Sequence, residues 1–138
     1  MAENIRLRVV TPSRVLVDEE VDEVAAPGAL GEFGVLPDHT AFFALLHIGE
    51  MHYKQGPVRR RLAVSGGYAE VLDNVMTVLP PAAEFADEID SARAQRAKER
   101  AEKSMAELTR DEKDWEMAEA ALQRALVRLQ VASREARR

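Results

Sequence analysis

Short apolar runs with period-two alternation fill the first part of the chain. Near the N-terminus Ile5, Leu7 and Val9 alternate with two arginines, which is the pattern of a half-buried β-strand. Turn signals at Gly56-Pro57, Gly66-Gly67 and Asp73-Asn74, among others, separate this run from similar ones that follow. The predicted strands are 5–9, 15–17, 21–26, 34–36, 41–46, 50–54, 59–64, 68–72 and 75–79. This spacing, without a helix between the runs, predicts an antiparallel β-sandwich or flattened barrel.

Beyond residue 86 the apolar positions recur every three or four residues, as in amphipathic helices. Asp87 is predicted to cap a first helix that runs to about Leu108. Thr109 and Glu112 form a capping box for a second helix, which extends to about Ser133. Because only two or three residues join them, the helices are expected to fold back as an antiparallel hairpin.

Each predicted helix carries one apolar seam of mostly small residues. Alanine lets two helices approach closely but buries little area, and at roughly 25 cal/mol per Å² such a seam contributes modest stability. A competing partner is therefore expected to be able to open the hairpin. The seam positions are Ala94, Ala97, Ala101, Met105 and Leu108 in the first helix, and Trp115, Ala118, Leu122, Ala125, Leu129 and Ala132 in the second.

Composition divides the 138 residues at the same place. All seven glycines and all six prolines precede the predicted helices, so we expect a sandwich domain over 1–86 and a helical domain over 87–138. The absence of cysteine excludes disulfides and thiolate metal sites. No apolar run approaches the roughly 20 residues of a membrane-spanning helix, and the charged N-terminus is unlike a signal peptide.

Charge is distributed unevenly along the chain. Residues 1–86 hold 7 basic and 12 acidic side chains, whereas residues 87–138 hold 12 of each. The last stretch, 124–138, carries five arginines and one glutamate. A basic end on a neutral tail favours an acidic protein surface as its partner, whereas a nucleic-acid binder would more often have a basic face over the whole domain.

Four arginines are expected to converge on one side of the hairpin. Arg93 and Arg100 are seven residues apart on one flank of the first helix, and Arg124 and Arg128 share a flank of the second. Folding the chain between the helices sets position n beside roughly position 220 minus n, so the two pairs lie level. Arginine suits bidentate contact with phosphate oxygens. The alternative is an ordinary charged helix face, solvated or paired with nearby glutamates.

Other chemical readings of the sequence are weaker. The glycines at 28, 31 and 34 are followed by a strand and turn instead of a helix, so they lack the geometry of a phosphate-binding loop. The three histidines have no acidic partner at a recognised metal-site spacing, and no metal site is predicted. No nucleophile, base and oxyanion donors can be assembled, so we expect a protein that is not an enzyme.

Three segments of the sequence closely resemble ATP synthase epsilon subunits, and the resemblance covers essentially the whole chain. They are Val9–Pro12, the loop Gly31–His39, and Ser65–Val71. Departures are minor: Asp38 stands where glycine is usual, Ala41 where proline is usual, and Met51 where leucine or isoleucine is usual. The resemblance implies a sandwich of about ten strands followed by a helical hairpin.

That resemblance also implies partners and a location. Such subunits are non-catalytic rotor components of the proton-translocating F-type ATP synthase, docked on the gamma subunit and the membrane ring of c subunits. The loop with Gly31, Glu32 and His39 faces this ring, and an acidic Glu32 there can pair with a basic ring residue. The implied location is peripheral, on the cytoplasmic side of the bacterial plasma membrane, with contact to the membrane only through the complex.

For regulation, the resemblance implies ATP as a ligand, with Mg²⁺ as a possible companion and no required cofactor. ATP-binding members of the family hold the nucleotide with a segment Ile-Asp-x-x-Arg-Ala and arginines of both helices. The positions that match are Glu84, Ile89, Asp90, Arg93, Ala94, Arg100, Arg124 and Arg128. When ATP is scarce, the helices would extend along gamma, and their basic end would meet the catalytic beta subunits and block hydrolysis. The alternative function is a free-standing adaptor with a coiled-coil tail and no nucleotide.

Overall fold

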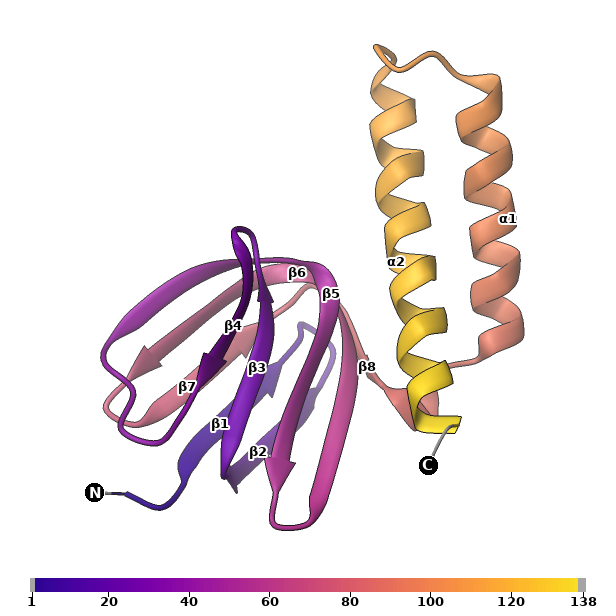
Figure 1. Cartoon of the computed structure of the whole chain (residues 1–138). Coiled ribbons are helices and arrows are strands. Elements are labelled where there is room, and N and C mark those ends of the chain that lie inside the picture. The colour runs from indigo at the N-terminus through magenta and orange to yellow at the C-terminus, as the bar shows by residue number, and fades with distance from the viewer. Residues whose placement is uncertain (1, 137–138) are drawn as a thin grey trace. The chain divides into compact units, whose positions relative to one another are not determined.

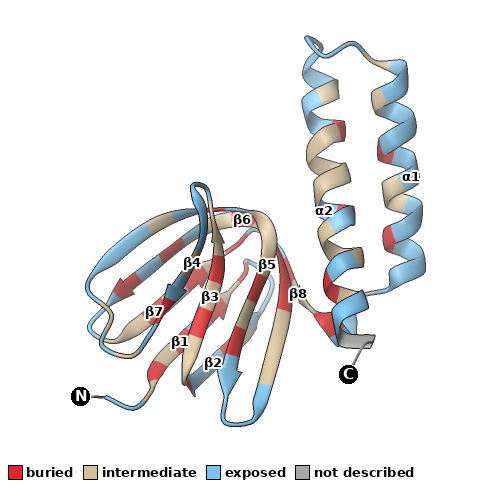
Figure 2. Cartoon of the chain, in the orientation of Figure 1, coloured by how far each residue is buried: buried red, intermediate tan, exposed pale blue. Residues whose placement is uncertain are grey.

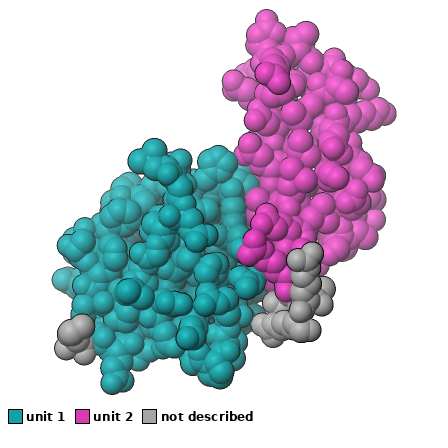
Figure 3. Space-filling view, viewed as in Figure 1, with its two compact units in different colours: residues 1–85 teal, residues 86–138 magenta. Residues whose placement is uncertain are grey.

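The computed structural model describes residues 2–136, and the side chains of residues 2–134. The chain forms two compact units, residues 1–85 and residues 86–138, which Figure 3 distinguishes by colour. Each unit has its own secondary structure: the first consists of strands and the second of helices (Figure 1). The two units are therefore described separately.

The first unit is a β-sandwich, as predicted, with eight strands in the described part of the chain. The count is lower than about ten because β5 and β6, of 14 and 15 residues, each continue through a predicted break. The strands are β1 Ile5–Val10, β2 Val15–Val21, β3 Glu23–Gly28, β4 Gly31–Val35, β5 Phe42–Gln55, β6 Val58–Leu72, β7 Val75–Leu79 and β8 Ala83–Phe85.

The two long strands connect the layers of the sandwich. They pair with each other antiparallel along nearly their whole length, and both curve strongly (Figure 1). Along its other edge β6 pairs with β8 through residues 62–64 and with β7 through residues 68–72. The strand order is β2-β1-β7-β6-β5-β3-β4, with β1 and β7 parallel. A sheet that bends back on itself in this way encloses its apolar face.

Alternating positions on the strands supply the core, which appears as red bands along the ribbon in Figure 2. Ile5, Leu7 and Val9 are fully buried, which confirms the alternation predicted for the first strand. Tyr53 is the largest fully buried side chain, and burial raises the pKa of its hydroxyl. The remaining core members include Val21, Met51, Leu62, Val64, Val71, Met76 and Val78.

Two of the three predicted turns end a strand, and one does not. Gly56-Pro57 joins β5 to β6, and Asp73-Asn74 joins β6 to β7 with φ of 50° and 62°. Such paired positive φ angles are those of a two-residue hairpin turn. The turn predicted at Gly66-Gly67 is wrong as a strand boundary: both glycines have positive φ, 106° and 94°, inside β6. They redirect the strand without ending it.

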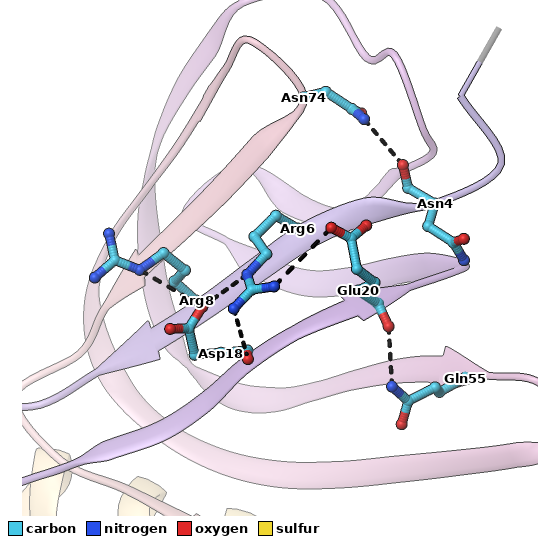
Figure 4. Close-up of polar contacts among 7 residues, drawn as sticks. All are labelled: Asn4, Arg6, Arg8, Asp18, Glu20, Gln55 and Asn74. Atoms are coloured by element: carbon cyan, nitrogen blue, oxygen red, sulfur yellow. Dashed lines mark hydrogen bonds and ion pairs between the residues drawn. The ribbon is translucent and has the colours of Figure 1, made fainter.

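Polar side chains tie the outer strands of the sandwich together (Figure 4). Arg6 of β1 donates from Nε to Asp18 Oδ1 of β2 at 2.8 Å, and this hydrogen bond lowers the pKa of the Asp18 carboxyl. Gln55 Nε2 at the end of β5 donates to the Glu20 carbonyl at 2.9 Å. This side-chain hydrogen bond joins the end of β5 to β2, which is an edge strand of the sheet.

The second unit contains a short 3₁₀ turn, η1 Ala86–Glu88, and two helices, α1 Ser91–Glu107 and α2 Lys113–Ala136. The helices run antiparallel and pack together, as predicted (Figure 1). Thr109 and Glu112 are in contact, since the Thr109 N–H and hydroxyl both donate to Glu112 Oε1, at 3.3 and 2.8 Å. They do not form the predicted cap, because the Glu112 N–H donates to the Thr109 carbonyl and closes a separate turn, and α2 begins after it, at Lys113. Within the described residues, neither helix is both long and apolar enough to cross a bilayer.

Candidate functional site

The first helix begins later than the sequence predicted. Asp90, with extended backbone angles, is its N-cap: Oδ1 accepts a hydrogen bond from the Arg93 N–H at 3.0 Å. The predicted cap, Asp87, lies in the 3₁₀ turn instead. The correction has a local cause, because the Ile89 N–H bonds to the Ala86 carbonyl at 3.4 Å and closes a separate turn before the helix starts.

We expect Asp90→Ala to destabilise the hairpin by about 1 kcal/mol, because the first turn of α1 loses the acceptor for one of its free N–H groups. The matched control is Asp87→Ala, which removes an acidic residue of the same type three positions away but no cap. Hydrogen exchange of the α1 amides measures the difference. Equal exchange in the two variants would mean that the cap contributes nothing.

Buried alanines form the seam between the helices. In α1 the buried side chains are Ala94 and Ala101, seven residues apart, and in α2 Ala118 and Ala125 are buried with the same spacing. In an antiparallel pair joined at 109–112, Ala94 therefore lies level with Ala125 and Ala101 with Ala118. Every other predicted seam residue is half-buried. The seam was thus predicted correctly, except that the fully buried Val131, next to the predicted Ala132, was not among its predicted members.

The four arginines lie on these two helices, next to the seam. Arg93 and Arg100 each precede a buried alanine of α1, and Arg124 precedes the buried Ala125 of α2. One residue corresponds to about 100° around a helix, so these side chains leave the helices beside the contact line. Arg93, Arg100 and Arg124 are exposed, whereas Arg128 is half-buried. This arrangement can offer several guanidinium groups to one polyanion.

The rest of the predicted ATP set lies in three different environments. Ile89 and Asp90 are at the start of α1, where Asp90 is engaged as the cap. Ala94 is fully buried, so its methyl group serves the seam. Glu84 belongs to the sandwich unit, where it pairs with Ala63 in the β6–β8 ladder and is half-buried. The four arginines and Asp90 therefore belong to the helical unit, whereas Glu84 belongs to the sandwich unit.

The predicted ring-facing residues are at and near the β3–β4 hairpin. Gly31 has φ of 128°, which an L side chain rarely adopts, and Glu32 is exposed one residue later. Asp38, which replaces the usual glycine, has φ of 63°, a left-handed angle that aspartate tolerates better than most residues. His39 is half-buried, and its ring packs edge-on against Phe42 with centroids 5.7 Å apart.

A neighbouring apolar surface was missed by the sequence reading. We call it the Phe43–Tyr68 face, formed by Phe43, Leu45 and Tyr68, which are 62%, 62% and 43% exposed. Leu45 is directly opposite Tyr68 in the β5–β6 ladder, and the Phe43 and Tyr68 rings are 5.5 Å apart. An open groove of about 600 Å³ adjoins it, lined by residues 28–33 and 42–45. The signal was the unbroken apolar run 41–46, which is typical of a strand covered on both faces.

The described side chains contain no group of three or more histidine, aspartate or glutamate residues arranged to hold a metal ion. The charged groups with clearly shifted pKa values include side chains of the sandwich unit. For example, the hydrogen bond from Arg6 lowers the pKa of Asp18. The exposed arginines of the helices and the Phe43–Tyr68 face are the remaining candidates for contact with a ligand or a protein partner.

Two family models together match nearly the whole chain. The model described as ATP synthase, Delta/Epsilon chain, beta-sandwich domain matches residues 4–86, and the one described as ATP synthase, Delta/Epsilon chain, long alpha-helix domain matches residues 87–133. Among curated relatives, the ATP synthase epsilon chain of Syntrophobacter fumaroxidans is 52% identical over 97% of this chain and 99% of its own length. The epsilon chain of Geobacter sulfurreducens is 49% identical over 100% of both.

Solved structures agree with the fold at much lower identity. A chain of the Euglena gracilis mitochondrial ATP synthase, in a structure of OSCP, F1 and c-ring, has a TM-score of 0.72 at 20% identity, covering 100% of this chain and 84% of that one. A chain of the Tetrahymena thermophila mitochondrial enzyme, in a structure of central stalk and c-ring, has a TM-score of 0.62 at 11% identity, covering 92% and 95%.

A β-sandwich followed by an antiparallel helical hairpin thus defines a small stalk subunit of a rotary ATPase. The chain belongs to the ATP synthase epsilon chain family. It is a non-catalytic rotor component of the central stalk. This assignment excludes the alternative function, a free-standing adaptor protein.

Proposed function

We propose that the chain couples the gamma subunit to the c-ring and restrains ATP hydrolysis through a helical hairpin that senses ATP. The observation that carries the sensing role is the placement of Arg93, Arg100 and Arg124 beside the buried alanines of two packed helices. Guanidinium groups that converge on one side of the hairpin would repel one another unless an anion lay among them, and a nucleotide triphosphate supplies that charge.

The Phe43–Tyr68 face is the proposed docking surface for gamma. Exposed aromatic side chains that contact each other across two strands are costly for a protein that stays alone in water, and Tyr is enriched at the centres of interfaces. The exposed Glu32 on the β3–β4 hairpin is the proposed contact with a basic loop of the c-ring. The structure from Tetrahymena, whose description names central stalk and c-ring, supports this choice of partners.

The proposed nucleotide site lies at the end of the hairpin where α1 begins. Arg93, Arg124 and Arg128 lie near the same level of the two helices, beside the N-terminus of α1. The positive end of the helix dipole adds to their charge, so phosphate oxygens are favoured there. Arg100 is two turns further along α1, within reach of an extended triphosphate.

ATP then acts by shifting the population of folded hairpins. A ligand that binds only the folded hairpin stabilises it by RT ln(1 + [L]/Kd), about 2.7 kcal/mol at a hundredfold excess. The seam consists largely of alanines and is weak, so this amount is enough to decide its state. Without ATP, the helices extend and their basic end meets the beta subunits on the cytoplasmic side of the membrane. Arg137 and Arg138 of that end lie outside the described residues.

Binding of Mg-ATP to the purified chain, measured by calorimetry, tests the sensing role. Arg124→Ala is expected to weaken binding by roughly 10- to 100-fold, because a charge-assisted hydrogen bond to phosphate contributes about 1.5–3 kcal/mol. Arg96→Ala is the matched control, since Arg96 is an exposed arginine on the face of α1 turned away from the seam. Unchanged affinity in Arg124→Ala would remove that residue from the site.

A further inference from the structure

Outside the proposed docking surfaces, one polar chain crosses three strands of the sandwich. Arg59, at the start of β6, donates from NH1 to His52 Nδ1 of β5 at 2.7 Å, and its NH2 lies 3.4 Å from Glu23 Oε1 of β3. The strand register explains the contact, because Lys54 pairs with both Arg59 and Glu23, and His52 is two residues before it on the same face. We call this set the His52–Arg59–Glu23 chain.

The contact between Arg59 and His52 fixes the protonation state of the imidazole. A guanidinium has only N–H donors, so His52 Nδ1 must be the unprotonated acceptor and the ring must be neutral, with its proton on Nε2. His52 is half-buried, and this burial, followed by the charge of Arg59, lowers the pKa of the ring below its ordinary value of 6.5. A proton on Nδ1 would abolish the hydrogen bond and set two cations against each other.

Charged groups of both signs face His52 from the elements around it. On β5 itself Glu50 and Lys54 share its face, and β6 contributes Arg59 and Arg61. Glu23 faces it from β3, and the charge of Glu32 acts on it from β4. The carboxylates favour a charged ring, but burial and the two arginines oppose it. A released Arg59 has room to move, because an open hollow of about 260 Å³ lies beside it, lined in part by Glu23, Gly34 and Leu36.

We propose that the His52–Arg59–Glu23 chain is a proton-sensitive latch: protonation of His52 expels Arg59 and loosens the β5–β6 hairpin from β3. The direction of the pH effect follows from linkage. Because folding lowers the affinity of His52 for a proton, the opened hairpin takes up that proton first as the pH falls, and opening is favoured below about pH 6.5. The latch is complete within the sandwich unit and does not depend on ATP binding by the helices.

NMR titration of the full chain tests the first half of the latch. His52 should titrate below 6.5, the ordinary value for histidine. In Arg59→Gln, which keeps a donor but removes the charge, the midpoint of His52 should rise towards 6.5. A midpoint at or above 6.5 in the unaltered chain would overturn the proposal.

Hydrogen exchange tests the second half. After correction for intrinsic rates, the amides of residues 52–61 should lose protection from exchange between pH 7.5 and 5.5. The protection factor should fall by about tenfold for each pH unit by which the midpoint of His52 lies below 6.5. His52→Gln, which accepts from Arg59 at any pH, should abolish this loss, whereas His47→Gln should leave it intact. The same acid-induced loss in His52→Gln would overturn the latch. If His52→Gln fails to fold, Arg59→Gln supplies the comparison, since it should reduce the loss.

Discussion

Replacing Gly67 with alanine should destabilise the sandwich by about 2–5 kcal/mol, the sum of a left-handed backbone penalty of about 1–2 and a packing clash of about 1–3. Gly67 has φ of 94°, and an added Cβ would lie 2.3 Å from the Leu79 carbonyl oxygen and 2.7 Å from the Pro80 Cα. Both neighbours are backbone atoms, which cannot move aside as a flexible side chain does. Urea denaturation of the chain measures the loss as a lower midpoint.

Two other glycines provide graded controls for this measurement. Gly56→Ala should cost about 1–2 kcal/mol, because its φ of 60° is left-handed but no atom lies within 4 Å of the new Cβ. Gly34→Ala should change stability by less than about 1 kcal/mol, since its nearest neighbour, the Val24 carbonyl oxygen, is 3.9 Å away. Equal losses in Gly67→Ala and Gly56→Ala would show that the clash is relieved at no cost.

Placing a charge on the Phe43–Tyr68 face should abolish docking to gamma while the subunit still folds. In Tyr68→Asp, a carboxylate would be buried against an apolar surface, and we expect affinity for gamma to fall by about 30-fold or more, corresponding to at least 2 kcal/mol. Because Tyr68 is 43% exposed in the free chain, its loss should cost the fold little. Calorimetry with purified gamma measures the affinity.

Val58→Asp is the matched control for docking, because Val58 is a comparably exposed apolar residue, at 47%, placed at the β5–β6 turn. It should bind gamma as the unaltered chain does. If Tyr68→Asp binds gamma with unchanged affinity, the docking surface lies elsewhere on the sandwich. Such a result would leave the ATP-sensing proposal untouched, since the arginines involved are in the helical unit.

The helical unit shows how much local pattern can establish. The positions of Ala94, Ala101, Ala118 and Ala125 followed from a period of three and four residues, and all four are buried. The contact between Thr109 and Glu112 was equally readable, because the two residues are three apart in sequence, although α2 begins only at Lys113. Asp87 and Asp90 offered two caps of the same type, and only the turn closed by Ala86 and Ile89 decided between them.

The amino-acid sequence by itself determined the alternation of the strands, the helical hairpin, its alanine seam and the arginines beside it, because each depends on residues a few positions apart. Tertiary structure alone decided that β6 continues through Gly66-Gly67, that Leu45 faces Tyr68, and that Arg59 reaches His52 and Glu23. These features depend on which strands pair and in what register. Register is fixed by burial of the whole apolar face, a property that no short segment of the chain contains.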